Sequence, residues 1–287
     1  MDLTNERDIE RLLKKHGFRF LKSMGQNFLI DGSVPERIAS EAGIDGTFGV
    51  LEVGPGIGAL TGVLSRYAAK VLSVELDQRL LPLLGDTMAE FPNVRILRGD
   101  ILKLDIGKTV TSEMPGLRYA VCANLPFNIT TPVLTALIEA KIFETITVMV
   151  QREAALRCCA APGTADYGAF TVYVKYHAEP EILFDIPPAS FIPQPKVTSS
   201  AIMLKLRASP PVEIENKALF FRVVRASFAQ RRKTLVNSLE AAFGGGFSKE
   251  ELRQIVTDCG LDVMTRGEAL DISGFAAVAR RLGEKPV

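Results

Sequence analysis

Asn124-Leu125-Pro126-Phe127 is the stretch whose residue types point most directly to chemistry. Asn124 offers an amide oxygen, and Leu125 is biased toward extended geometry by the proline after it, so its carbonyl can project outward. Phe127 adds a flat aromatic face. Two acceptors beside a stacking ring suit the exocyclic amino group of a planar base, because hydrogen bonds from its N–H groups favour the pyramidal, nucleophilic amine. An ordinary strand-to-helix turn is the alternative interpretation of the same residues.

This stretch is expected to lie at the carboxyl end of a strand. The apolar run 119–123 predicts a buried strand before it, and Thr130-Thr131-Pro132 predicts the start of a helix after it. In an open α/β sheet, ligands bind at the carboxyl edge of the strands. The tetrapeptide is therefore placed where a substrate can reach it.

A glycine-rich loop follows the predicted strand 50–53 and precedes the predicted helix 59–67. Gly54 and Gly56 allow the backbone to approach a ligand closely, and the helix start offers unpaired N–H groups. The pattern Gly54-x-Gly56-x-x-Ala59 also fits the dinucleotide fingerprint, with Glu75 at the distance expected of a ribose-binding acid. An NAD-linked oxidoreductase is thus one reading, although it leaves the Asn124 stretch without a role.

Two acids are expected at the carboxyl ends of the next two strands. Glu75 ends the predicted strand 70–76, where it could accept hydrogen bonds from a ribose diol. Asp100 and Ile101 follow the predicted strand 94–98, where a carboxylate could accept from an adenine amino group. Each acid alone could be a surface charge at a strand end. Their shared placement beside the glycine loop favours a nucleoside-containing cofactor.

The remainder of the sheet is expected to close with an antiparallel edge. The β-branched run 145–151 predicts a fifth strand, followed by a helix over 151–159. Alternation of apolar residues over 170–176 and in part of 197–206 predicts an antiparallel strand pair. The spaced prolines of 190–197 predict a stiff extended connector between them.

Ser209-Pro210-Pro211 is the predicted domain boundary, separating a catalytic domain (1–208) from a helical one (209–287). Helices are expected over 216–239, 248–259 and 273–282. On a regular first helix, Arg231 would point into the apolar face. That helix is therefore either interrupted near Gln230, or Arg231 is paired.

Composition favours a soluble protein without disulfides or metal. The chain has 287 residues, a formal net charge of +1, four cysteines and two histidines. Charges interrupt residues 1–20, so we expect neither a secretory leader nor a membrane span, and a cytoplasmic location. The cysteines lack paired metal spacing, and neither histidine lies near a nucleophile motif.

Basic residues are concentrated in two stretches. Residues 7–22 carry six Lys/Arg against two acids, and residues 222–240 carry five against one. Such stretches in a nearly neutral chain suggest a polyanionic partner, although a solvated helix face is the commoner meaning of one charge run. The second stretch supplies the candidate RNA-binding residues Arg222, Arg225, Arg231, Arg232 and Lys233.

Taken together, these stretches resemble the ribosomal RNA adenine N6-dimethyltransferases, most closely those that act on bacterial 16S rRNA. The similar segments cover nearly the whole chain in order. They are Gly25-Gln26-Asn27-Phe28-Leu29, the loop 51–61, Val74-Glu75-Leu76-Asp77, Gly99-Asp100, Asn124-Leu125-Pro126-Phe127-Asn128-Ile129, Phe191-x-Pro193-x-Pro195-Lys196-Val197 and Phe228-x-Gln230-Arg231-Arg232-Lys233.

The resemblance implies a class I, S-adenosyl-L-methionine-dependent methyltransferase fold. Its Rossmann-like sheet would be mostly parallel and seven-stranded with an antiparallel edge, followed by a small all-α domain. The implied cofactor-binding residues are Asn27 and Leu29 closing over the site, Gly54 and Gly56 at the methionine end, Glu75 at the ribose, Asp100 and Ile101 at the adenine, and Asn124.

The resemblance also implies the reaction. Asn124 and the Leu125 carbonyl would hold adenine N6, and Phe127, where the family often has Tyr, would stack on the base. The implied substrates are two adjacent adenosines near the 3′ end of 16S rRNA in a pre-30S particle, modified by a monomeric enzyme. Two alternatives remain open: a 23S-directed erythromycin-resistance methyltransferase, whose glycine loop usually has Ser and Lys at Pro55 and Ile57, and an RNA-binding assembly factor.

Overall fold

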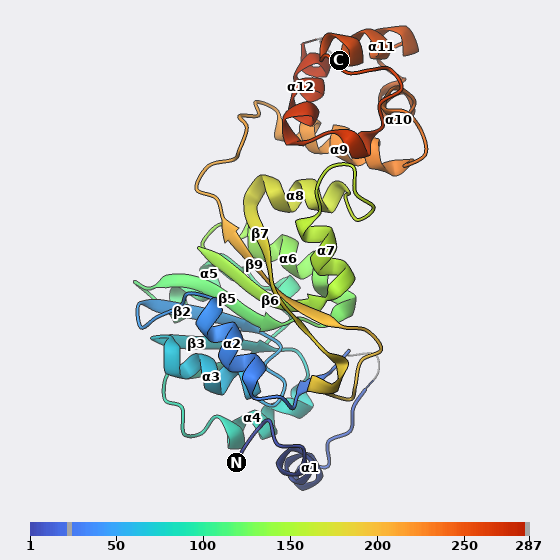
Figure 1. Ribbon diagram of the computed structural model, residues 1–287. Coiled ribbons are helices and arrows are strands. Elements are labelled where there is room, and N and C mark those ends of the chain that lie inside the picture. Colours follow the sequence, from blue (N-terminus) through green and yellow to red (C-terminus); the bar gives the residue numbers. More distant parts are fainter. Residues whose placement is uncertain (22–24, 285–287) are drawn as a thin grey trace. The chain divides into compact units, whose positions relative to one another are not determined.

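The computed structural model describes residues 1–21 and 25–284 (Figure 1). Two compact units share the chain: the first comprises Met1–Ala155 and Glu179–Leu206, and the second Leu156–Ala178 and Arg207–Val287. Lys22, which belongs to the first basic stretch, lies outside the described residues. The predicted boundary at 208 falls beside the return of the chain to the second unit at Arg207. Because residues 156–178 also group with that unit, the two-segment division stays a prediction.

The first unit is built on a seven-stranded sheet of order β4-β3-β2-β5-β6-β9-β7. Strands β4, β3, β2, β5 and β6 run parallel, and β9 pairs antiparallel with β6. The expected mostly parallel sheet with an antiparallel edge is therefore confirmed, although the partner of β9 is β6 and not a strand over 170–176. The apolar runs of β2, β3, β5 and β6 are buried on both faces, which is typical of parallel strands. The bounds are β2 Phe48–Val53, β3 Lys70–Glu75, β4 Val94–Arg98, β5 Arg118–Asn124, β6 Thr145–Gln151, β7 Ala178–Ile186 and β9 Ser199–Leu206.

Helices lie against this sheet (Figure 1). Apolar side chains of the helices and strands are buried together between them. Ile38 and Leu64 of two neighbouring helices pack with Val50 and Val71 of the sheet. Among the described residues, no helix is both long and apolar enough to cross a bilayer. The helices of the first unit are α1 Glu6–Lys15, α2 Ser33–Glu41, α3 Ala59–Tyr67, α4 Leu81–Thr87, α5 Ile106–Glu113 and α6 Thr130–Glu139. Helix α7, Arg152–Cys159, continues into the second unit from Leu156 onward.

A short strand pair joins the N-terminal segment to the proline-rich connector. Strand β1 (Phe28–Leu29) pairs antiparallel with β8 (Phe191–Ile192), and Ile30 N donates to Ser190 O at 2.9 Å. Phe28 packs with Ile57 and Leu80 in a cluster that also holds the buried side of α1. The connector, although distant in sequence, therefore holds residues 28–30 in place.

Residues 169–177 form helix α8 (Ala169–His177), so the predicted strand over 170–176 is wrong. The Gly168 N–H donates to Thr171 Oγ1 at 3.1 Å, and this bond caps the start of the helix. Val172 and Tyr176, one helical turn apart, both pack into the core of the second unit. Alternating apolar residues also satisfy an i, i+4 pattern, and this packing selects the helix.

The second unit is all-helical around one apolar core. Its other helices are α9 Lys217–Ala229, α10 Leu235–Phe243, α11 Lys249–Asp258 and α12 Ile272–Gly283, and they bury Phe220, Leu235, Leu252 and Phe275 together. The single helix predicted over 216–239 is interrupted at Gln230, and Lys233 N donates to Gln230 O in the connecting turn.

Arg231 is also paired, so both conditions foreseen for it hold. Its Nη1 donates to Ala165 O at 2.8 Å, and its Nη2 lies 3.5 Å from Glu268 Oε2. On one regular helix, Arg222, Arg225, Arg232 and Lys233 would lie within roughly 100° of one another. Because α9 ends at Ala229, Arg232 and Lys233 lie outside the helix that carries Arg222 and Arg225, and this prediction is wrong.

Candidate active site

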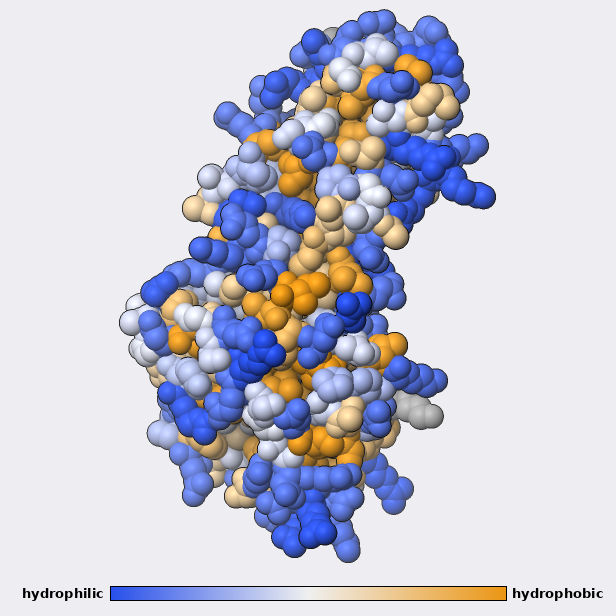
Figure 2. Space-filling view, viewed as in Figure 1, coloured by the Kyte–Doolittle hydropathy of each residue, from blue (hydrophilic) through white to orange (hydrophobic). Residues whose placement is uncertain are grey.

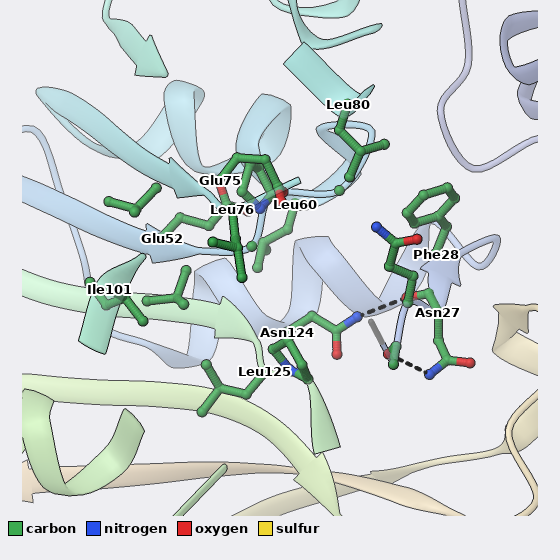
Figure 3. A pocket seen from close by; sticks show the side chains of 18 of the residues that line it. Asn27, Phe28, Glu52, Leu60, Glu75, Leu76, Leu80, Ile101, Asn124 and Leu125 are labelled. Carbon is green, nitrogen blue, oxygen red and sulfur yellow. Dashed lines mark hydrogen bonds between the residues drawn. The ribbon is translucent and has the colours of Figure 1, made fainter. Parts of the chain in front are cut away.

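A cavity of about 230 Å³ lies in the first unit, at the carboxyl edge of the parallel strands (Figure 3). Its walls come from the N-terminal segment, the loop after β2, the ends of β3 and β4, and the turn after β5. The cavity brings together all the predicted cofactor-binding and catalytic positions: Asn27, Leu29, Gly54, Gly56, Glu75, Asp100, Ile101, Asn124, Leu125 and Phe127.

The glycine loop has a backbone that only glycine adopts readily. Gly56 and Gly58 have φ values of 62° and 95°, in the left-handed region. A Cβ on Gly56 would lie 3.1 Å from the Phe28 ring, and one on Gly58 would lie 2.6 Å from Met88 Cε. The loop is therefore packed tightly from outside while its backbone lines the cavity.

Glu75 is a buried carboxyl on the cavity wall, only 5% exposed. Burial raises its pKa to about 7, and hydrogen bonds from the backbone N–H groups of Asp77 and Gly56 oppose that rise. The Asp77 N–H donates to Glu75 Oε1 at 2.7 Å. A buried carboxylate gains most from hydroxyl donors, so this position suits a vicinal diol.

Glu52 is a cavity residue that we did not foresee from the sequence. Its Oε2 accepts hydrogen bonds from Thr61 Oγ1 and Ser73 Oγ, both at 2.6 Å, which ties β2 to α3 and β3. Burial raises its pKa to about 7. The sequence feature that could have identified Glu52 is the presence of an acidic residue inside the apolar run 50–53. The carboxyl favours folding below its ordinary pKa, and this contribution is lost as the pH rises through about 7.

The predicted adenine end of the cavity combines one carboxylate with apolar walls. Asp100 accepts from Leu102 N at 3.1 Å, and Ile101 is buried next to it. Leu76, which is 52% exposed, lines the cavity from the end of β3. A planar base between Leu76 and Ile101 could present its amino group to the Asp100 carboxylate.

Asn124 is oriented by the N-terminal segment. Its Nδ2 donates to the backbone oxygen of Asn27 at 3.1 Å, and Figure 3 shows the amide nitrogen turned toward that residue. Because the nitrogen is engaged, Oδ1 is the group free to serve as an acceptor. Leu125 N donates to Met149 O at 3.1 Å, which fixes the backbone that carries the second predicted acceptor. Phe127 follows, half-buried at the cavity.

The five candidate RNA-binding residues have different environments in the second unit. Arg222 donates to Ala242 O at 2.7 Å and stacks over the Phe243 ring, so it holds α9 against α10. Arg231 is paired as described above. Within the described part of the chain, Arg225, Arg232 and Lys233 are exposed and have no carboxylate partner. Figure 2 shows strongly hydrophilic side chains projecting near the α9–α10 connection.

The arrangement defines the class of protein. A mostly parallel seven-stranded sheet with an antiparallel strand beside β6, a glycine loop after β2, and acids at the ends of β3 and β4 is the architecture of a class I methyltransferase. The model of the family described as ribosomal RNA adenine dimethylase matches residues 17–277, and the chain belongs to that family.

Relatives and solved structures agree with this membership. A protein of Geobacillus sp. (strain WCH70), named ribosomal RNA small subunit methyltransferase A, is 43% identical over 284 residues, covering 98% of each chain. A Listeria monocytogenes serotype 4a protein of the same name is 44% identical over 277 residues, covering 95% of this chain and 94% of its own.

Two solved structures share the fold. A dimethyladenosine transferase from Plasmodium falciparum superposes with a TM-score of 0.74 at 23% identity, covering 89% of this chain and 97% of its own. The 23S rRNA methyltransferase ErmE gives a TM-score of 0.68 at 26% identity, covering 89% of this chain and 99% of its own. The family match and the relatives show that the chain is a ribosomal RNA methyltransferase, and these two structures show its fold.

Proposed function

We propose that this enzyme transfers methyl groups from S-adenosyl-L-methionine to N6 of two adjacent adenosines near the 3′ end of 16S rRNA, giving N6,N6-dimethyladenosines. The reaction would take place on a pre-30S particle in the cytoplasm, as part of small-subunit biogenesis. One observation carries the proposal: Asn124 presents a fixed acceptor in the same cavity as the glycine loop and the buried Glu75. The names of the relatives at 43–44% identity support the small-subunit substrate.

The cavity residues fit S-adenosyl-L-methionine. Glu75 suits the ribose diol, Asp100 the adenine amino group, and Ile101 one face of the adenine ring. The backbone of Gly54 and Gly56 would lie at the methionine end, where the absence of side chains permits close approach. When bound, this cofactor supplies an electrophilic methyl group on a sulfonium.

The chain's own residues act on the target base. Asn124 Oδ1 and the Leu125 carbonyl would accept the two N–H groups of N6, which directs the nitrogen lone pair toward the methyl group. Unstacking the base costs a few kcal/mol, and stacking on Phe127 would recover part of it. Catalysis then comes from positioning and from acceptors set in place before the reaction.

The substrate is tested by offering 30S subunits from a strain that lacks this modification, together with an equal amount of 50S subunits and labelled S-adenosyl-L-methionine. We expect label in 16S rRNA only. Fully modified 30S subunits are the control and should remain unlabelled. Label in 23S rRNA would overturn the small-subunit assignment and favour the activity named for ErmE.

Arg232 and Lys233 are proposed to contact rRNA phosphates. We expect Arg232→Ala with Lys233→Ala to weaken 30S binding and to lower the slope of log affinity against log salt by about 2, one for each contact. The binding is measured by filter retention over a salt series.

A matched control replaces two cations that are already paired. Lys249 and Arg253 contact Glu240 and Glu250, so Lys249→Ala with Arg253→Ala should leave the slope unchanged. An equal slope change in both double variants would show that general charge, rather than the α9–α10 connection, determines affinity. Arg222→Ala is unsuitable, because it also removes a contact that holds α9 against α10.

A further inference from the structure

Residues 25–29, here called the N-terminal strap, lie along the cavity between its two ends. All five line it. Gly25 packs against residues 126–128, in the turn after β5. A Cβ on Gly25 would lie 3.3 Å from Asn128 Oδ1 and 3.8 Å from Pro126 Cβ. The strand pairing of Phe28 and Leu29 involves only two residues on each side. The position of Gly25, Gln26 and Asn27 therefore depends on side-chain bonds as well.

Gln26 makes such a bond on the cofactor side of the cavity. Its Nε2 donates to Asp77 Oδ2 at 2.8 Å, and the Asp77 N–H donates to Glu75 Oε1 at 2.7 Å. Gln26 Oε1 is buried and has no hydrogen-bond partner among the described residues. An orphaned buried acceptor lowers stability. The unpartnered Oε1 therefore offsets part of the stability that the bond from Nε2 to Asp77 contributes.

The next residue of the strap acts on the other side of the cavity. The Asn27 backbone oxygen accepts from Asn124 Nδ2 at 3.1 Å, and the Asn27 side chain donates to Gly25 O at 3.2 Å. The orientation of the Asn124 amide thus depends on where the strap holds one carbonyl. A displacement of this carbonyl would release the amide to rotate.

We infer that Gln26 is a positioning residue that links the ribose end of the cofactor site to the target-adenine site. It fixes the strap to Asp77, beside Glu75, and so holds the Asn27 carbonyl where it directs Asn124 Oδ1 at the substrate amine. Cofactor contacts at Glu75 are then coupled to the geometry of Asn124 through Asp77, Gln26 and Asn27. This inference deepens the proposed function and rests on it.

The kinetic test is Gln26→Met, which keeps the length of the side chain and removes the bond to Asp77. We expect kcat for methyl transfer to fall about tenfold, since small misplacements of a reacting group are costly. The Kd for S-adenosyl-L-methionine should change by less than about threefold. Gln254→Met is the matched control, because it removes a Gln–Asp bond of 2.7 Å on α11 and should leave both constants unchanged.

The second test does not require turnover. The affinity of the RNA substrate is measured with and without saturating S-adenosylhomocysteine, and the ratio of the two values cancels the phosphate contacts. We expect the cofactor product to tighten RNA binding in the wild type, and the ratio to fall toward one in Gln26→Met. Equal ratios in the two proteins, or an unchanged kcat with only a weaker cofactor affinity, would overturn the inference.

Different results would refute the proposed function and the role of Gln26. A wild-type protein that neither binds S-adenosyl-L-methionine nor methylates 30S subunits would refute the proposed function. A wild type that does both, with a Gln26→Met variant of equal kcat and equal coupling, would refute only the role of Gln26.

Discussion

Replacing Asn124 with alanine should lower kcat for methyl transfer by at least about a hundredfold, the usual effect of removing one preorganised group that stabilises a developing charge. The variant loses Oδ1, the acceptor that the bond to Asn27 leaves free. The Leu125 backbone, held by Met149 O, is unaffected. Single-turnover kinetics with saturating cofactor and 30S subunits measure the effect.

Asn124→Asp separates orientation from acceptor strength. Aspartate has the same size and stronger acceptor oxygens, but it cannot donate to the Asn27 carbonyl. Repulsion between the two oxygens should turn the carboxylate away, and we expect a loss of the same order as for alanine. An Asn124→Asp enzyme with wild-type kcat would show that the bond from Asn124 Nδ2 to Asn27 O is irrelevant to catalysis.

Replacing Glu75 with alanine should raise the Kd of S-adenosyl-L-methionine by at least about a hundredfold. Hydrogen bonds to a charged group contribute about 1.5–3 kcal/mol each, and the ribose diol would make two of them. The fold should survive, because removing a buried carboxyl with a raised pKa also removes a desolvation cost. Isothermal titration gives the affinity, and thermal unfolding checks the fold.

The pKa of Glu75 also predicts a pH dependence of cofactor binding. Above about 7 the carboxyl is ionised and accepts from both hydroxyls, whereas below that value it is protonated and loses acceptor capacity. Hydrogen bonds from the ligand favour the ionised form, so affinity should be constant at high pH and fall as the pH drops through about 7.

Two glutamine variants identify the carboxyl group whose titration causes this pH dependence. Glu75→Gln should bind weakly at every pH, without the inflection. Glu52→Gln should retain the inflection, although Glu52 also has a pKa near 7. If Glu75→Gln keeps the wild-type pH profile, the titrating group is not Glu75.

Strands β2, β3, β5 and β6 were predictable because they are apolar runs of the length that parallel strands need. Strand β7, Ala178–Ile186, was not predicted, because charged residues interrupt its apolar ones. The interval 169–177 was not predictable either, since its alternating pattern serves a strand and a helix equally, and the choice depends on packing against Phe220 and its neighbours in the core. The break at Gln230 was foreseen only as one of two options. Arg231 inside an apolar face revealed the conflict, and the partners Ala165 and Glu268 are distant in sequence.

The cavity was predictable where a residue type at a strand end suggests a ligand by itself, as with Glu75, Asp100 and Asn124. Residues that act through other residues were not. Gln26 and Asp77 are 51 positions apart, and no local pattern shows that they meet. Their roles, like the predicted site roles of the strand-end residues, stay proposals until the variants are measured.

The most direct measurement is the identity of the nucleosides that wild-type enzyme and Asn124→Ala produce from unmodified 30S subunits, resolved by mass after complete digestion of the 16S rRNA. We expect N6,N6-dimethyladenosine from the wild type, at two adjacent positions, and little or none from the variant over the same time. Methylation at another atom or on another base, or equal yields from the two proteins, would contradict the assignment of Asn124 as the acceptor for adenine N6.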